Sequence, residues 1–158
     1  MIHLVLYHPA IPQNTGNIAR TTVGMGAHLH LIHPMKFEIT DHAVKRAGLD
    51  YWPSVTLTQH ADDDAFFRWL DAPSGGQGRA PYLVTKFGRH RYDQPDYADR
   101  DIVILGNENT GLPQAWHDRW PDRTVHIPMP GPISGGDNIR SYNLANAAAI
   151  VLAAACLR

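Results

Sequence analysis

Near its end the chain reads Val125-His-Ile-Pro-Met-Pro130 and, after seven intervening residues, Asn138-Ile-Arg-Ser-Tyr-Asn-Leu-Ala-Asn146. The first segment predicts a short apolar strand, and the second predicts a polar loop that opens an alanine-rich helix, Leu144–Leu157. The loop holds more Asn, Arg and Ser than a simple connection requires. Because binding groups collect on loops held by rigid elements, this strand, loop and helix are the first candidate site.

The same layout of strand, polar loop and helix occurs twice earlier in the chain. Ile2–Tyr7 predicts a buried strand, and Asn14-Thr-Gly-Asn-Ile-Ala-Arg20 predicts a helix capped by Asn14 or Thr15. Ile102–Leu105 predicts a second such strand, followed by the loop Gly106-Asn-Glu-Asn-Thr-Gly-Leu-Pro113. Further strands are expected at His28–Ile32, Val55–Leu57 and Tyr82–Thr85, and further helices at Asp41–Ala47 (capped by Asp41), Ala65–Leu70 and Pro113–Trp120.

This alternation predicts a single α/β domain over residues 1–158, with a mostly parallel sheet flanked by helices. Ligands of open α/β sheets bind outside the carboxyl ends of the strands, where all three polar loops are expected to lie. The loops match neither G-x-G-x-x-G nor the Walker pattern, which argues against an ordinary dinucleotide- or nucleotide-binding fold.

Composition narrows the class of protein further. The chain is 44% hydrophobic and 18% charged, as in a soluble globular protein, and no apolar run reaches transmembrane length. One cysteine, Cys156, fits a reducing compartment, so a cytoplasmic protein without a membrane partner is expected. The net charge of −1 provides no general basic field for nucleic acid, and DNA is not expected as a partner. Local basic patches remain at Lys45-Arg46 and at Lys86 with Arg89–Arg91.

Each polar candidate also has a structural interpretation. Asn14, Glu108 and Asn143 could be helix caps, and Arg20 could be a surface ion-pair partner. His28, His30 and His33 suggest a metal site, but no metal-binding spacing accompanies them. We therefore expect no metal, and interpret these residues as partly exposed strand histidines. The joint placement of the candidates after strand ends favours a site over separate caps.

The three loops resemble, in order and spacing, the three motifs of the SpoU branch of the SPOUT RNA methyltransferases, and the likeness covers nearly the whole chain. The opening segment and Arg46-Ala-Gly-Leu-Asp-Tyr51 are most similar to members that methylate the ribose 2′-hydroxyl of the tRNA wobble nucleotide, cytidine or modified uridine at position 34. The resemblance implies S-adenosyl-L-methionine as cofactor and tRNA, of leucine isoacceptors, as substrate. It also implies a C-terminal trefoil knot and a homodimer with each site at the subunit interface.

The resemblance also implies roles for single residues. The cofactor-binding positions are Leu83, Gly106, Ile127 and Ser141, the first three acting largely through backbone groups. Arg20 matches the catalytic arginine at the ribose hydroxyl, and the polar residues that organise the site match Asn14, Glu108, Ser141 and Asn143. Because arginine keeps its proton in almost any protein environment, stabilising a developing alkoxide is a less demanding role for Arg20 than general base.

Two alternatives stay open from the sequence. The protein could methylate another tRNA or rRNA position, or it could be a non-catalytic RNA-binding or assembly factor with the same fold. The chain also departs from the family pattern: Asn107 stands where proline or a small residue is common, and Gly131–Asp137 looks like an insertion.

Overall fold

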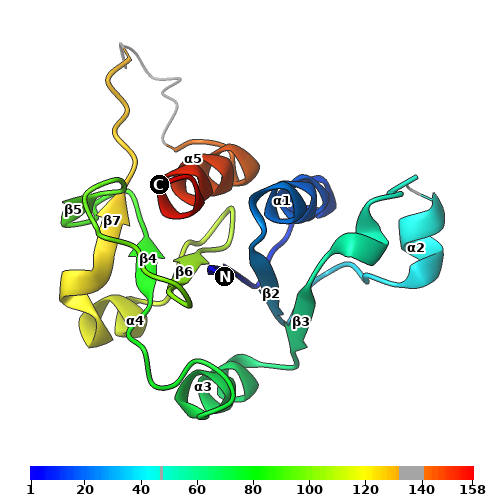
Figure 1. Cartoon of the computed structure of the whole chain (residues 1–158), viewed down its shortest axis with the longest axis horizontal. Coiled ribbons are helices and arrows are strands. Elements are labelled where there is room, and N and C mark those ends of the chain that lie inside the picture. Colours follow the sequence, from blue (N-terminus) through cyan, green and yellow to red (C-terminus); the bar gives the residue numbers. More distant parts are fainter. Residues whose placement is uncertain (47, 132–140) are drawn as a thin grey trace.

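A computed structural model describes residues 1–46, 48–131 and 141–158. Within these ranges the strands form one seven-stranded, all-parallel sheet in the order β3-β2-β1-β6-β4-β7-β5 (Figure 1). The strands are β1 (His3–Tyr7), β2 (His28–Ile32), β3 (Leu57–His60), β4 (Tyr82–Val84), β5 (His90–Arg91), β6 (Ile102–Leu105) and β7 (Thr124–His126).

Helices cover both faces of the sheet (Figure 1). One face carries α1 (Pro12–Met25) and α5 (Leu144–Cys156), which lie side by side, and the other carries α3 (Asp63–Asp71) and α4 (Gln114–Arg119). The short helix α2 (Asp41–Arg46) follows β2 at one end of the molecule, and single 3-10 turns occur at Trp52–Ser54 and Pro121–Arg123. The predicted α/β class is confirmed. No helix in the described ranges is long and apolar enough to cross a membrane.

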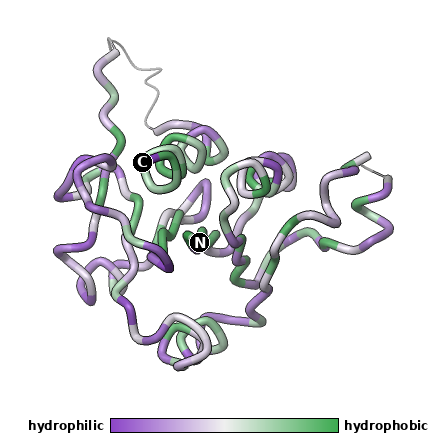
Figure 2. Tube along the Cα trace, in the orientation of Figure 1, coloured by the Kyte–Doolittle hydropathy of each residue, from purple (hydrophilic) through white to green (hydrophobic). Residues whose placement is uncertain are grey.

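The core follows from the alternation of side chains along the central strands. Leu4 and Leu6 of β1 pack with α1 and α5, whereas Val5 packs on the opposite face with residues of α3 and α4. All three are fully buried, and each contributes about 1.5–3 kcal/mol of transfer free energy. Figure 2 shows hydrophobic residues concentrated on the central strands and on α5. Strands buried on both faces explain the near-continuous apolar runs in the sequence.

Two predicted helix caps are wrong. Helix α1 begins at Pro12, so Asn14 and Thr15 lie inside the helix and are buried. In α2 the cap is Thr40, whose Oγ1 accepts from the Ala43 amide at 3.1 Å, and Asp41 is the first helical residue. The predicted last residue of this helix, Ala47, lies outside the described residues.

Two strands also differ from the expectation. The strand predicted at Val55–Leu57 lies at Leu57–His60, because Leu57 pairs with Leu29 and the register runs on to His60 opposite Ile32. Strand β5 was not predicted. It pairs with β7, through His90 opposite Val125, and its two polar residues carry no apolar signal.

A row of histidines crosses the α3 face of the sheet. His30 is fully buried, with Nε2 2.9 Å from His3 Nδ1 and Nδ1 3.0 Å from His60 Nε2, so the expectation of a partly exposed side chain is wrong for His30. Burial, with weaker repulsion from neighbouring histidines, lowers the pKa of His30 to about 2 and the pKa of His60 to about 4. Burial also lowers the pKa of His3 to about 4, helped by His28, Arg100, the N-terminus and Arg79. The row is therefore a chain of neutral imidazoles that hydrogen-bond to one another. Ring nitrogen atoms of His3, His28 and His30 lie within 4.8 Å of one another.

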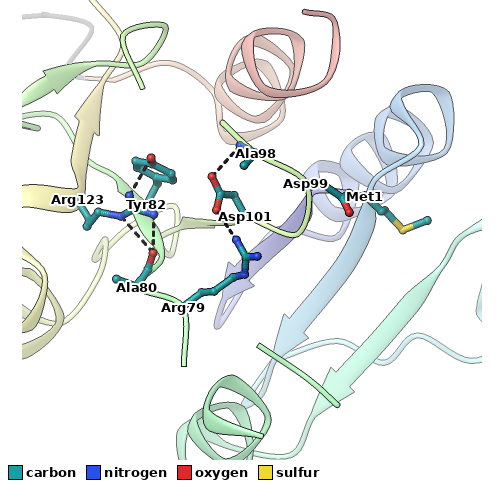
Figure 3. Close-up of polar contacts among 8 residues, drawn as sticks. All are labelled: Met1, Arg79, Ala80, Tyr82, Ala98, Asp99, Asp101 and Arg123. Atoms are coloured by element: carbon teal, nitrogen blue, oxygen red, sulfur yellow. Dashed lines mark hydrogen bonds and ion pairs between the residues drawn. The ribbon is translucent and has the colours of Figure 1, made fainter. Parts of the chain in front are cut away.

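Polar contacts hold the chain at the amino ends of the strands (Figure 3). Arg79 donates to Asp101 Oδ1 at 3.3 Å, just before β6. The Arg123 guanidinium donates to the Ala80 carbonyl at 2.8 Å and 3.2 Å, and its central carbon lies 3.7 Å from the centroid of the Tyr82 ring. These contacts fix the edge of the sheet opposite to the polar loops.

Candidate functional site

A cavity of about 800 Å³ lies at the carboxyl edge of the sheet. Its apolar wall comes from the ends of β4, β6 and β7, through Val84, Leu105 and Ile127, and from Leu144 of α5. Its polar lining comes from the loop between β6 and α4, from α1 and from the chain just before α5. This volume and this mixture of apolar walls with a few polar groups are typical of small-molecule sites.

The loop after β6 is shaped by Gly106, Asn107 and Gly111. A Cβ on Gly106 would lie 2.5 Å from the Gly111 carbonyl carbon, so only glycine permits this turn. Asn107 and Gly111 exchange two backbone hydrogen bonds, at 3.1 Å and 2.9 Å. Oδ1 of Asn107 accepts from the amides of Asn109 and Thr110, and its Nδ2 donates to the His8 carbonyl at 2.6 Å. The departure at Asn107 therefore supplies a side chain that builds the turn and joins it to the chain after β1.

Glu108 serves as a remote cap for α1. The N-cap residue of this helix, Ile11, offers no side-chain acceptor. Glu108 instead accepts from the amides of Ala10 at 2.8 Å and Ile11 at 3.2 Å, and from Asn14 Nδ2 at 3.4 Å. A carboxylate at the positive end of the helix dipole is stabilising. Glu108 thereby joins the loop after β6 to the start of α1.

Asn143 joins the start of α5 to the same group. Its Nδ2 donates to Asn14 Oδ1 at 2.9 Å, while its Oδ1 accepts from the amides of Ala145 at 2.9 Å and Asn146 at 3.4 Å, capping α5. We call these three residues the Glu108–Asn14–Asn143 frame. The frame connects the three polar loops singled out in the sequence. Glu108 and Asn143 act as caps, Asn14 lies within α1, and all three residues line the cavity.

The other predicted site residues are placed as follows. Gly106, Ile127 and Ser141 line the cavity. Leu83 is fully buried in the centre of β4, and Val84 and Thr85 line the cavity in its place. Arg20 is exposed and does not line the cavity; its guanidinium carbon lies 5.9 Å from the centroid of the Tyr51 ring. Arg20 lies six positions after Asn14, which places it about 9 Å further along the helix axis and on a different side of the helix.

Sequence reasoning did not select several residues that shape the cavity. Tyr142 lines it and donates its hydroxyl to the Pro128 carbonyl at 2.8 Å, which links the loop after β7 to the start of α5. In the sequence, only its position between the candidates Ser141 and Asn143 indicated that Tyr142 could belong to the site. Residues 132–140, which include Asn138–Arg140 and most of the apparent insertion Gly131–Asp137, lie outside the described residues.

The chain matches the model of the SpoU rRNA Methylase family over residues 1–153. The chain belongs to this family. A relative from Listeria monocytogenes, provisionally named tRNA (cytidine(34)-2'-O)-methyltransferase, is 45% identical over 152 residues, which are 94% of this chain and 83% of the relative. A relative from Methylovorus glucosotrophus, named tRNA (cytidine(34)-2'-O)-methyltransferase, is 35% identical over 153 residues, 96% and 92% of the two chains.

Solved structures of this kind share the fold. One, described as giving insights into the 2-OH methylation of C/U34 on tRNA, is 39% identical with a TM-score of 0.77, covering 96% of this chain and 91% of the other. An AdoMet-bound rRNA methyltransferase from Sinorhizobium meliloti is 27% identical with a TM-score of 0.77, covering 98% of this chain and 55% of the other.

The frame predicts the effect of removing its central side chain. Asn14→Ala is expected to lower the free energy of unfolding by about 1–3 kcal/mol, because Asn143 Nδ2 and Glu108 lose their shared partner in a buried position. Urea unfolding measures the change. Asn17→Ala, an exposed asparagine on the same helix, is the matched control. Equal effects of the two substitutions would show that the frame contributes nothing to stability.

Proposed function

We propose that the protein is a single-domain enzyme, over residues 1–158, that transfers the methyl group of S-adenosyl-L-methionine to the ribose 2′-hydroxyl of nucleotide 34 of tRNA. The observation that carries the proposal is the cavity braced by the Glu108–Asn14–Asn143 frame, formed from the three loops that resemble the family motifs. Relatives at 35–45% identity named for this reaction support the choice of substrate.

The cavity fits the proposed cofactor. Val84, Leu105, Ile127 and Leu144 offer apolar contact for an adenine ring, while the backbone of Gly106 and the hydroxyl of Ser141 lie in the same lining for polar contacts. S-adenosyl-L-methionine supplies a methyl group already activated by its sulfonium, so the residues need only bind, orient and stabilise. Leu83 remains a proposed contact through its backbone, next to Val84 in the wall.

Arg20 is proposed to act on the ribose. A ribose hydroxyl is a weak nucleophile, and its reaction requires stabilisation of the negative charge that develops on the oxygen. The fixed positive charge of Arg20 can provide this, or can hold the adjacent phosphate. In this proposal Glu108, Asn14 and Asn143 position the first turns of α1 and α5, and Arg20 follows on α1.

A homodimer is proposed because Arg20 lies outside the cavity of its own chain. A second copy could place its Arg20 at the mouth of this cavity, so that each site combines groups from two subunits. The proposal retains the trefoil knot that the family resemblance implies for the C-terminal segment.

The substrate proposal is tRNA of leucine isoacceptors, which implies a cytoplasmic protein. The purified protein, incubated with S-adenosyl-L-methionine and tRNA lacking the modification, is expected to produce a 2′-O-methyl nucleoside at position 34, detected by mass spectrometry of tRNA digests. An unmethylated position 34 would overturn the choice of nucleotide. Methylation of ribosomal RNA in a parallel reaction would favour the second candidate, which the similarity to the Sinorhizobium meliloti rRNA methyltransferase supports at lower identity.

A further inference from the structure

Phe87 is an unusual surface residue. Its side chain is 92% exposed, the largest value among the exposed large hydrophobic residues in the described ranges. It lies in the turn between β4 and β5, at the carboxyl edge of the sheet, and it lines the rim of the cavity. Single exposed apolar residues are common, so exposure alone gives it no role. Phe87 is distinguished by its position at the mouth of the cavity and by the hydrogen bonds that hold the turn carrying it.

The turn that carries Phe87 is fixed on both sides. Before it, the Thr85 amide donates to the Val125 carbonyl at 2.9 Å. After it, a Cβ on Gly88 would lie 2.2 Å from the Val125 carbonyl carbon, so this glycine permits close approach to β7. The Gly88 carbonyl accepts from His126 Nδ1 at 2.7 Å, and the Arg89 amide donates to Thr124 Oγ1 at 3.0 Å. An aromatic ring is thus presented to solvent from an anchored turn.

The charge around the ring is positive and only partly compensated. Arg89 pairs with Asp122. The Arg91 guanidinium donates to both carboxylate oxygens of Asp93, at 2.6 Å and 2.5 Å. Lys86 precedes Phe87, is exposed, lines the same cavity and has no ion pair within the described residues. A cation beside an exposed aromatic ring is the combination that binds single-stranded nucleic acid, through phosphate and base respectively.

We propose that Phe87 stacks on an unpaired nucleobase of the substrate RNA at the mouth of the cavity, while Lys86 contacts a backbone phosphate of the same strand. This inference rests on the proposed function and names a substrate-binding site within it. A base has a flat face of the size of the ring, whereas a protein partner would require a wider apolar patch than one side chain provides. The site is sequence-tolerant, because every base can stack.

The test measures RNA binding apart from methyl transfer. The probe is a fluorescein-labelled tRNA anticodon stem-loop, and anisotropy gives its dissociation constant for the wild type, Phe87→Ala, Phe87→Leu and Phe87→Trp. Phe87→Ala is expected to weaken binding about tenfold or more, in line with alanine substitution of stacking residues. Phe87→Leu should bind the stem-loop as weakly as Phe87→Ala, whereas Phe87→Trp should bind it as tightly as the wild type. A leucine variant as tight as the wild type would overturn stacking.

A second probe identifies the base contact. The probes are stem-loops that carry an abasic nucleotide at one loop position each. At one of these positions the abasic nucleotide should weaken binding to the wild type but should not weaken binding to Phe87→Ala any further. The two changes remove the same contact, so their effects do not add. Additive losses at every position would contradict the proposal. For Lys86→Met, the slope of log affinity against log salt should fall by about one, the value of a single phosphate contact. Lys36→Met, at another exposed lysine, is the control.

Two further measurements separate this proposal from others. Calorimetry with S-adenosyl-L-methionine should give the same affinity for the wild type and Phe87→Ala; a weaker value would make Phe87 a cofactor contact instead. Light scattering should give the same mass for both proteins; a change would make Phe87 a subunit contact. Binding of the stem-loop without any methylation of tRNA would refute the proposed function while leaving the stacking proposal to the anisotropy results.

Discussion

Arg20→Ala is expected to lower the rate of methyl transfer to tRNA by at least about a hundredfold, the usual cost of removing one group that stabilises a developing oxyanion. Binding of S-adenosyl-L-methionine should be unchanged, because Arg20 lies outside the cavity. Single-turnover rates and calorimetry measure the two quantities. Arg20→Lys should recover only part of the rate, since lysine keeps the charge but loses the planar, two-point hydrogen bonding of arginine.

The control for charge alone is Arg68→Ala, an exposed arginine on α3, on the opposite face of the sheet. This variant should methylate tRNA at the wild-type rate. Wild-type methylation by Arg20→Ala would refute the assignment of Arg20.

Mixed dimers reveal which subunit supplies Arg20. Ile127→Trp is expected to fill the cavity and abolish cofactor binding. Arg20→Ala and Ile127→Trp should each be inactive, but their co-expressed mixture should regain about a quarter of wild-type activity if Arg20 acts across a two-fold interface, because half of the dimers hold one intact site. No recovery, with mixed dimers shown to form, would place Arg20 in the site of its own chain.

The free energy of unfolding is expected to fall steeply as the pH drops below about 6.5, the usual pKa of histidine in an unfolded chain. In the folded protein the pKa of His30 is about 2 and those of His3 and His60 are about 4. Between these values and 6.5 the unfolded chain binds more protons than the folded one, so stability is complete above pH 6.5 and is lost as the pH falls. His30 alone contributes a slope of about 1.4 kcal/mol per pH unit in this window, and His3 and His60 act in the same direction.

Urea unfolding at several pH values between 7.5 and 5 measures this slope, in a range where carboxylates still carry their charge. His30→Phe keeps a ring in the same place. It should reduce the slope of unfolding free energy against pH by the contribution of one proton, about 1.4 kcal/mol per pH unit. His42→Phe, at an exposed histidine on α2, should leave the slope unchanged. A stability that does not vary over this range would show that the histidine row is not held neutral.

The sequence predicted most of what depends on neighbours along the chain. Apolar runs identified β1 and β6, and the alternation of His and Leu identified β2. Gly26, directly after α1, adopts the left-handed conformation that closes the helix. The start of α1 was missed because its cap, Glu108, comes from a loop distant in sequence. Strand β5 was missed because its pairing with β7, not its composition, defines it.

The candidate site divides in the same way. The Asn14, Glu108 and Asn143 positions were selected from motifs, and the structure brings them together. The motifs could not predict which atoms hydrogen-bond to each other, for example the donation from Asn107 Nδ2 to the His8 carbonyl. The histidine row depends on the register of three strands, which no local pattern fixes, so the burial of His30 between His3 and His60 was not foreseen.

The Glu108–Asn14–Asn143 frame has a consequence for when the cavity can form. Its hydrogen bonds span 94 residues between Asn14 and Glu108 and 129 residues between Asn14 and Asn143. Contacts of such large sequence separation form slowly, because the entropy of closing the long intervening loop is lost before the contact stabilises the chain. On the ribosome, a chain that has not yet released α5 cannot complete the cavity. Affinity for S-adenosyl-L-methionine would then report that α5 has been synthesised and has folded against α1.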